Sequence, residues 1–109
     1  IVTIDLNGKQ IDGSTDDVLA MGNIDEKFKS FGWEVLKVQE GNNIDKILET
    51  LSYAKSLTGK SKPIVILMHT EMGNGVDFMM NTHAWHGVAP NDEQLANALN
   101  QNPETLGDY

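Results

Sequence analysis

Five consecutive apolar residues, Ile64-Val65-Ile66-Leu67-Met68, constrain the fold more than any other feature of this chain. The run does not alternate with polar residues, which is typical of a strand buried on both faces of a parallel sheet. Parallel strands need crossover connections, and these connections usually contain helices. The run therefore predicts an α/β fold.

Two further strands are expected, over residues 1–6 and 33–38. In the first strand Val2, Ile4 and Leu6 alternate with the residues between them. Helical patterns and capping residues predict helices over 14–21, 23–31, 43–54 and 91–99, with either Asn42 or Asn43 as the cap of the third. This order predicts three parallel strands with flanking helices, part of a doubly wound parallel sheet. Residues 71–90 show no periodicity, and a loop of that length is often functional.

The first strand stops at Asn7-Gly8, a turn signal. Asp5 and Asn7 therefore lie at the carboxyl end of a strand, where open α/β sheets bind ligands. The amide oxygen of Asn7, beside turned backbone carbonyls, suits Mg²⁺ or Ca²⁺. The alternative is a plain loop in which Asn7 caps its own turn.

Two motifs carry a resemblance to a known family. The first is Asp5-x-Asn7-x-x-x-Ile11-Asp12-Gly13. The second is His69-Thr70-x-x-Gly73-x-Gly75-Val76-x-Phe78-Met79, followed by Trp85-His86-Gly87-x-Ala89-Pro90-Asn91-Asp92. Together they resemble the amino-terminal, thiamine diphosphate-binding subunit of a split transketolase, over essentially the whole chain. The Gly-Asp-Gly that opens the family motif is absent, so residues 1–109 are expected to be a single domain or fragment, the carboxyl-terminal part of the diphosphate-binding domain.

The resemblance implies roles for individual residues. The Asn7 side chain and the Lys9 carbonyl would bind Mg²⁺ (or Ca²⁺), and Ile11 and Met72 would contact the thiazolium ring of thiamine diphosphate. His86 would lie near the diphosphate and the sugar hydroxyls as a hydrogen-bonding and proton-shuttling, catalytic residue. Lys9 departs from the apolar residue that the family usually has, and Met72 and Asn74 stand where related split subunits often carry Lys. Ile11 could equally be an ordinary core residue.

The implied reaction is the transfer of a two-carbon ketol unit from a ketose phosphate to an aldose phosphate. The implied partner is a transketolase carboxyl-terminal subunit, in a homodimer or heterotetramer, and it would supply the glutamate that activates the cofactor. One alternative is another enzyme of the superfamily, similar to dihydroxyacetone synthase or deoxyxylulose phosphate synthase. The other is a stable fragment without catalytic activity, and the chain alone is expected to be inactive.

Composition limits the other classes of function. The net charge is −8 and the basic residues are all Lys, which argues against nucleic-acid binding and leaves no guanidinium fork for a sugar phosphate. There is no Cys and no 18-residue apolar run, so we expect a cytoplasmic protein that spans no membrane. His83 and His86 could suggest zinc, but Cys is absent and a third His is not nearby. Gly59-Lys60-Ser61 resembles a phosphate loop only faintly, and residues 103–109 resemble the natural carboxyl end of such subunits.

Overall fold

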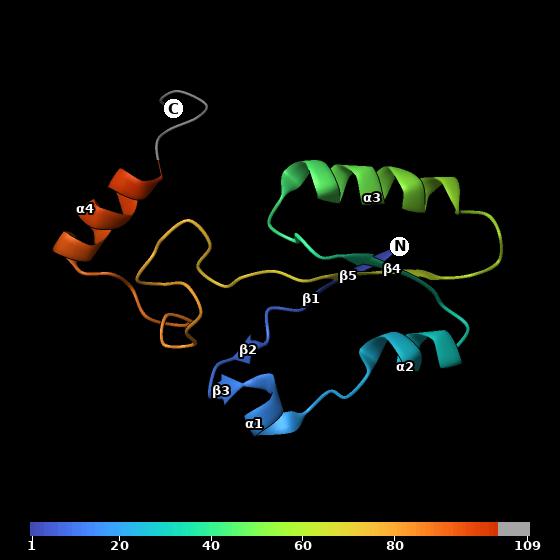
Figure 1. Ribbon diagram of the computed structural model, residues 1–109, viewed down its shortest axis with the longest axis horizontal. Helices are drawn as coiled ribbons and strands as arrows, with labels where there is room; N and C mark the ends of the chain where they lie inside the picture. Colours follow the sequence, from blue (N-terminus) through green and yellow to red (C-terminus); the bar gives the residue numbers. More distant parts are fainter. Residues whose placement is uncertain (103–109) are drawn as a thin grey trace.

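The chain forms a three-stranded parallel sheet with helices on both faces (Figure 1). The computed structural model describes residues 1–102, so the expected carboxyl end, 103–109, lies outside the described residues. The strands are β1 (Val2–Asp5), β5 (Ile64–Met68) and β4 (Glu34–Val38), in the order β1-β5-β4. The buried strand over 64–68 and the parallel α/β fold are both confirmed.

The core is centred on β5. Its residues Ile64, Val65, Ile66 and Leu67 are at most 2% exposed. From Val65 to Met68 each β5 position is flanked on both sides, as where Val65 lies opposite Val2 of β1 and Val35 of β4. The unbroken apolar run is therefore explained by a strand that has neighbours in the sheet and cover on its faces.

Two helices cover the sheet from opposite sides. Helix α3 (Ile44–Ser56) lies on one face and α2 (Ile24–Ser30) on the other, and both contact β4 (Figure 1). Both begin at the expected caps, since the side chains of Asn23 and Asn43 accept hydrogen bonds from the first turns of their helices. Asn43, and not Asn42, is thus the cap of α3.

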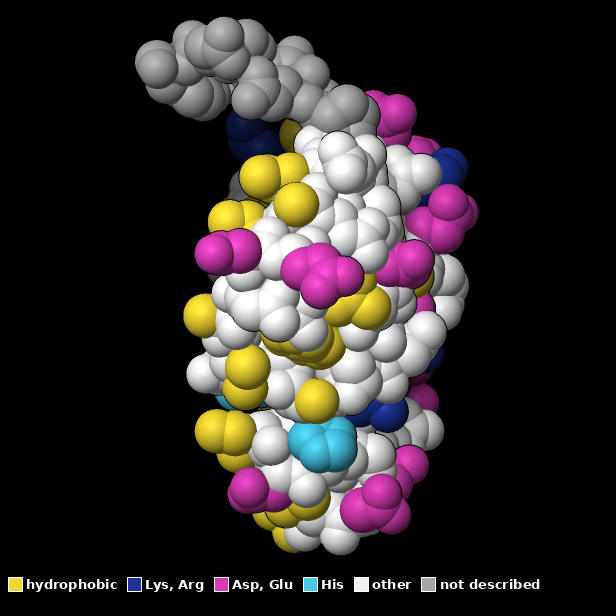
Figure 2. Space-filling model, turned by 90° about the vertical axis from the view of Figure 1, so that its left-hand side faces the viewer, with side chains coloured by type: hydrophobic (Ala, Val, Ile, Leu, Met, Phe, Trp, Pro, Cys, Tyr) yellow, Lys and Arg dark blue, Asp and Glu magenta, His cyan; other side chains and the backbone are white. Residues whose placement is uncertain are grey.

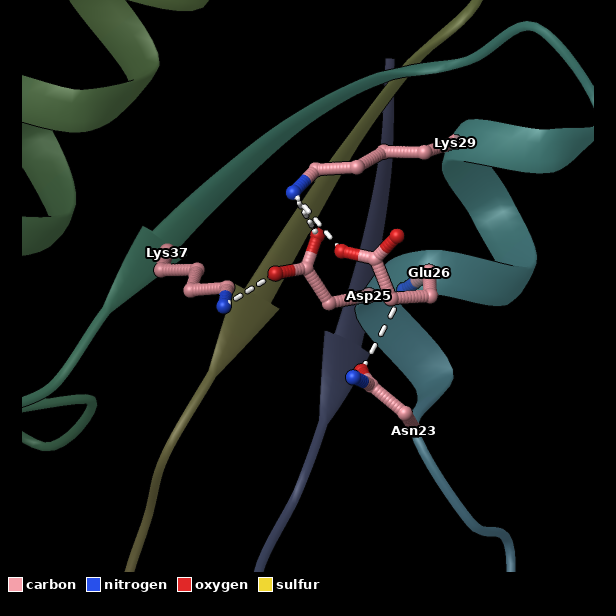
Figure 3. Close-up of polar contacts among 5 residues, drawn as sticks. All are labelled: Asn23, Asp25, Glu26, Lys29 and Lys37. Atoms are coloured by element: carbon pink, nitrogen blue, oxygen red, sulfur yellow. Dashed lines mark hydrogen bonds and ion pairs between the residues drawn. The ribbon is translucent and has the colours of Figure 1, made fainter.

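An ion-pair cluster attaches α2 to β4 (Figure 3). The carboxylate of Asp25 is buried at the sheet-facing side of α2 and pairs with Lys37 of β4. The ammonium of Lys29, one turn along α2, lies 3.1 Å from the other carboxylate oxygen of Asp25. Lys37, and after it Lys29, lower the pKa of Asp25, which stays ionised between two cations.

A small feature between β1 and α2 was not expected. Residues Lys9–Gln10 (β2) and Gly13–Ser14 (β3) pair as two-residue antiparallel strands, and α1 (Thr15–Leu19) follows with Ser14 as its cap. Gly8, at a φ of 70°, makes the turn that was expected after β1. Strands of two residues are too short to show periodicity, so sequence patterns do not reveal them.

The periphery leaves much apolar surface open. The radius of gyration is 17.0 Å, against about 13 Å for a compact chain of this length. An apolar hollow of about 560 Å³ lies between α1 and α2 and is lined by Phe31, which is 82% exposed, and Leu19, 80%. Figure 2 shows hydrophobic side chains spread over the side of the molecule at the left of Figure 1. Helix α4 (Asp92–Gln101) lies at this side and exposes 62% of Leu99.

Within residues 1–102 no helix is both long enough and apolar enough to cross a membrane.

Candidate functional site

An open cavity of about 700 Å³ lies at the carboxyl edge of the sheet. It is formed by the loops that follow all three long strands. The lining residues are Leu6, Asn7 and Gly8 after β1, residues 39–43 after β4, and His69, Thr70, Glu71 and Asn74 after β5. Because the strands are parallel, their carboxyl ends meet at one edge, and this is where an open α/β sheet binds ligands.

Asn7 lies at this edge with its amide already engaged in its own loop. Its Oδ1 accepts a hydrogen bond from the Lys9 backbone N–H at 2.8 Å, and its Nδ2 lies 3.3 Å from the Asp5 carboxylate, to which it donates. The turn-capping alternative is therefore what the structure contains. An amide oxygen has two lone pairs, so the second lone pair of Asn7 Oδ1 can still face a cation, and ligation by Asn7 stays a prediction.

The Asp5 carboxylate connects the ends of β1 and β5. Thr70 Oγ1 donates a hydrogen bond to Asp5 Oδ1, while Asn7 Nδ2 donates to Asp5 Oδ2. The carboxylate is held between the loops that follow two adjacent strands. It thus supplies negative charge beside the Asn7 amide, the kind of oxygen-rich setting that hard divalent cations prefer.

The loops after β4 and β5 meet through their backbones. His69 N–H donates to Val38 O at 2.8 Å, and Gly41 N–H donates to His69 O at 2.7 Å. A Cβ at Gly41 would lie 2.6 Å from that same His69 oxygen, so only glycine fits this crossing. The neighbouring Asn42 accepts a hydrogen bond from the Glu71 backbone N–H at 2.7 Å.

The long segment between β5 and α4 contains no helix or strand, as expected, but it is built from bonded turns. Trp85 Nε1 donates to Phe78 O at 3.0 Å, and the two rings stack edge to face with centroids 5.3 Å apart. The Asp77 N–H donates to Gln101 Oε1 at 2.8 Å, which ties the segment to the end of α4. The side chain of His86 is exposed just beyond Trp85.

The structure gathers only part of the predicted set of site residues. Of the predicted site residues, Asn7 lines the cavity. Lys9, Ile11, Met72 and His86 are not among the described residues that line it. Ile11 is 60% exposed, so the interpretation of Ile11 as an ordinary core residue is wrong. Met72 is half-buried and directly follows Glu71 on the cavity wall.

Sequence reasoning missed Gly41, Asn42, Glu71 and the contact of Thr70 with Asp5. A usable signal existed, because Gly41-Asn42 follows the end of a strand just as Asn7-Gly8 does. No group of three or more His, Cys, Asp or Glu side chains that could hold a metal ion occurs in the described part of the chain, residues 1–102.

Comparisons with known proteins agree on one family. A family model described as transketolase, thiamine diphosphate binding domain, matches residues 1–104. An apulose-4-phosphate transketolase subunit of Phocaeicola vulgatus is 31% identical over 106 residues, 97% of this chain and 37% of its own length. The 6-deoxy-6-sulfo-D-fructose transketolase subunit SqwG of a Clostridium species is 33% identical over 99 residues, 91% of this chain and 35% of its own length.

A solved structure gives the same result. Transketolase from Pichia stipitis, crystallised with sedoheptulose 7-phosphate, superposes with a TM-score of 0.77 at 27% identity. The match covers 88% of this chain and 14% of that one. The chain spans little more than a third of the length of the transketolase subunits that it matches, and 14% of the length of the transketolase of a Nostoc species.

Proposed function

Because this chain belongs to the transketolase family, through its thiamine diphosphate-binding domain, we propose that it serves a transketolase reaction. The reaction transfers a two-carbon ketol unit from a ketose phosphate to an aldose phosphate. The chain corresponds, in this proposal, to the carboxyl-terminal part of the diphosphate-binding domain of the amino-terminal subunit. The observation that carries the proposal is the position of Asn7, on the cavity at the carboxyl end of β1 and hydrogen-bonded to Asp5.

The donor set at the cavity fits a divalent cation bound to a diphosphate. Asn7 contributes a neutral amide oxygen, and the adjacent Asp5 contributes a carboxylate that Asn7 Nδ2 and Thr70 hold in place. The Asn7 side chain and the Lys9 backbone carbonyl would bind Mg²⁺ (or Ca²⁺), which offsets the charge of the diphosphate in the cleft. Thiamine diphosphate supplies the carbanion chemistry when bound.

The remaining residues would orient the cofactor and the sugar. Ile11 and Met72 would contact the thiazolium ring, and the exposed side chain of Ile11 is free to do so. His86 would donate hydrogen bonds to the diphosphate or sugar hydroxyls and hold or move a proton at an imidazole nitrogen. The stacked and hydrogen-bonded Trp85 supports this assignment, because it fixes the backbone immediately before His86.

The working enzyme would need more protein than this chain. We propose that the partner is a carboxyl-terminal transketolase subunit, in a homodimer or heterotetramer, with phosphosugar substrates and no nucleic-acid or membrane partner, in the cytoplasm. The open apolar surface at Phe31, Leu19 and Leu99 supports contact with further protein. The chain alone would be inactive, because in the described part of the chain Asn7 is the one proposed site residue that lines the cavity.

Cofactor titration tests the role of Asn7. In the complete enzyme Asn7→Ala should weaken thiamine diphosphate binding, measured by calorimetry with Mg²⁺, more than it raises the KM for sugars, because it removes a metal ligand and no sugar contact. An unchanged cofactor affinity with a raised sugar KM would show that Asn7 is misassigned.

A pair of histidine variants tests the role of His86. His86→Ala should lower kcat/KM by roughly 10²–10⁴-fold, the usual range for a positioned acid–base group. His83→Ala is the matched control, three residues away in the same exposed loop, and should cost far less. Equal losses in both variants, with loss of bound metal, would replace this assignment by a zinc site.

A further inference from the structure

We propose that Asn42 is a positioning residue, whose side-chain amide fixes the backbone at Glu71 and thereby places Met72 beside the cofactor. Asn42 Oδ1 accepts a hydrogen bond from the Glu71 N–H at 2.7 Å, and Asn42 Nδ2 lies 3.4 Å from Glu71 O, to which it donates. One side-chain amide therefore binds both polar groups of one residue, 29 positions away in the sequence. The inference deepens the proposed function and rests on it.

The contact continues the sheet beyond its last backbone hydrogen bonds. Strand β5 pairs with β4 up to Met68 and Val38, and the crossing at Gly41 N–H and His69 O extends this pairing by one step. At Glu71 the Asn42 amide takes the place of a neighbouring strand's peptide. Backbone hydrogen bonds thus hold the chain at His69, and a side chain holds it at Glu71.

The role of Asn42 is separate from the stability of the adjacent helix. The cap of α3 is Asn43, whose Oδ1 accepts from the N–H groups of Asp45 at 3.0 Å and Lys46 at 3.3 Å. The two neighbouring asparagines therefore bind different parts of the chain. Both line the cavity, but Asn43 caps α3 while Asn42 binds the segment after β5.

The position of Glu71 matters for the site because of what surrounds it. Asn42, Glu71 and Asn7 all line the same cavity, and Met72 is the next residue along the chain. If the Glu71 peptide is released, the flexible thioether of Met72 loses its anchor on the amino-terminal side. The cofactor would then have to order this segment when it binds, and its affinity would fall.

The test compares Asn42→Ala, Asn42→Asp and the control Asn23→Ala in the complete protein. Three measurements are made on each: hydrogen exchange at the Glu71 amide, affinity for thiamine diphosphate with Mg²⁺ by calorimetry, and the urea midpoint. Asn42→Ala should speed Glu71 exchange and weaken cofactor binding about tenfold, the cost of ordering the released segment on binding. The urea midpoint should change little, because both lost hydrogen bonds are exposed. Asn42→Asp keeps an acceptor for the Glu71 N–H and should recover much of the slow exchange.

Asn23→Ala should show the opposite pattern, a lower urea midpoint with unchanged Glu71 exchange and cofactor affinity, because Asn23 caps α2 and does not line the cavity. Glu71 exchange in Asn42→Ala that equals the wild-type rate would overturn the inference, as would equal losses of cofactor affinity in Asn42→Ala and Asn23→Ala. A wild-type protein that binds no thiamine diphosphate would overturn the proposed function itself. The two failures are therefore distinguishable.

Discussion

Gly41→Ala should be among the most damaging single-atom additions that this fold can receive. Gly41 lies where the loop after β4 crosses the end of β5. A Cβ there would come within 2.6 Å of the His69 carbonyl oxygen and 2.7 Å of Thr70 Cγ2. The Gly41 N–H already donates to the same His69 oxygen at 2.7 Å. Because the closest atom belongs to the backbone, no side-chain rotation relieves the contact and one of the two chains must move.

The expected cost follows from these two contacts. Forcing an extra carbon into a filled space costs about 1–3 kcal/mol. Lengthening the hydrogen bond from Gly41 to His69 loses up to about 1 kcal/mol more. We therefore expect Gly41→Ala to lower the free energy of unfolding by about 1–4 kcal/mol. With a urea m-value of about 2 kcal/mol/M, the midpoint should fall by about 0.5–2 M.

Urea unfolding of wild type, Gly41→Ala and Gly87→Ala checks this value. At Gly87 an added Cβ meets no atom within 4 Å, so the control should stay within about 0.5 kcal/mol of wild type. If Gly41→Ala and Gly87→Ala unfolded at the same urea concentration, the close approach of the two loops would be refuted. The same result would show that this crossing does not fix the cavity wall.

Three other substitutions probe the core, the ion-pair cluster and the long loop. Ile66→Ala, at a side chain 1% exposed in the central strand, should lower the unfolding free energy by about 2–5 kcal/mol in calorimetry. Asp25→Asn should flatten the acid side of the stability profile. The pairing with Lys37 lowers the pKa of Asp25 in the folded state. Asp25 therefore stabilises the fold above its ordinary pKa, and this stabilisation is lost as pH falls through the lowered pKa. Urea midpoints measured across that pH range test this. Trp85→Phe keeps a ring but loses the hydrogen bond to Phe78 O, and should speed amide exchange around that turn without unfolding the sheet.

Most of the fold follows from local signals in the sequence. The five-residue apolar run predicted the buried strand β5 with its bounds, because burial on both faces leaves no polar position. Asn23 and Asn91 marked helix starts, since an amide oxygen beside free N–H groups stabilises a first turn wherever the chain goes next. The pairing of β2 with β3 left no such signal, because two residues cannot show a period.

The site was only partly predictable, for a different physical reason. The rule that ligands bind at the carboxyl ends of strands placed Asn7 correctly on the cavity, with Asp5 hydrogen-bonded beside it. The groups that hold this edge together come from distant positions: Thr70 binds Asp5 across 65 residues, and Asn42 binds Glu71 across 29. A sequence pattern does not predict a side-chain contact at that separation, and each of these residues alone could equally have been a polar loop residue.

The division between gathered and ungathered residues has a physical basis in the sheet. Most residues that line the cavity lie within three positions of the carboxyl end of β1, β4 or β5, so the sheet holds their backbones. The exceptions are Asn42 and Asn43, which make side-chain contacts, and Asn74, which lies on a turn. Ile11 and His86 lie on segments with no strand of this sheet beside them, and both are exposed. An exposed isoleucine lowers its free energy by being covered, and a thiazolium ring with a neighbouring protein surface would cover it. The polar anchor of the site is thus built into the sheet edge, while its apolar contacts depend on what binds there. This difference predicts that Asn7 keeps its geometry without the cofactor and that Ile11 acquires its geometry on binding, which amide exchange measured with and without thiamine diphosphate would distinguish.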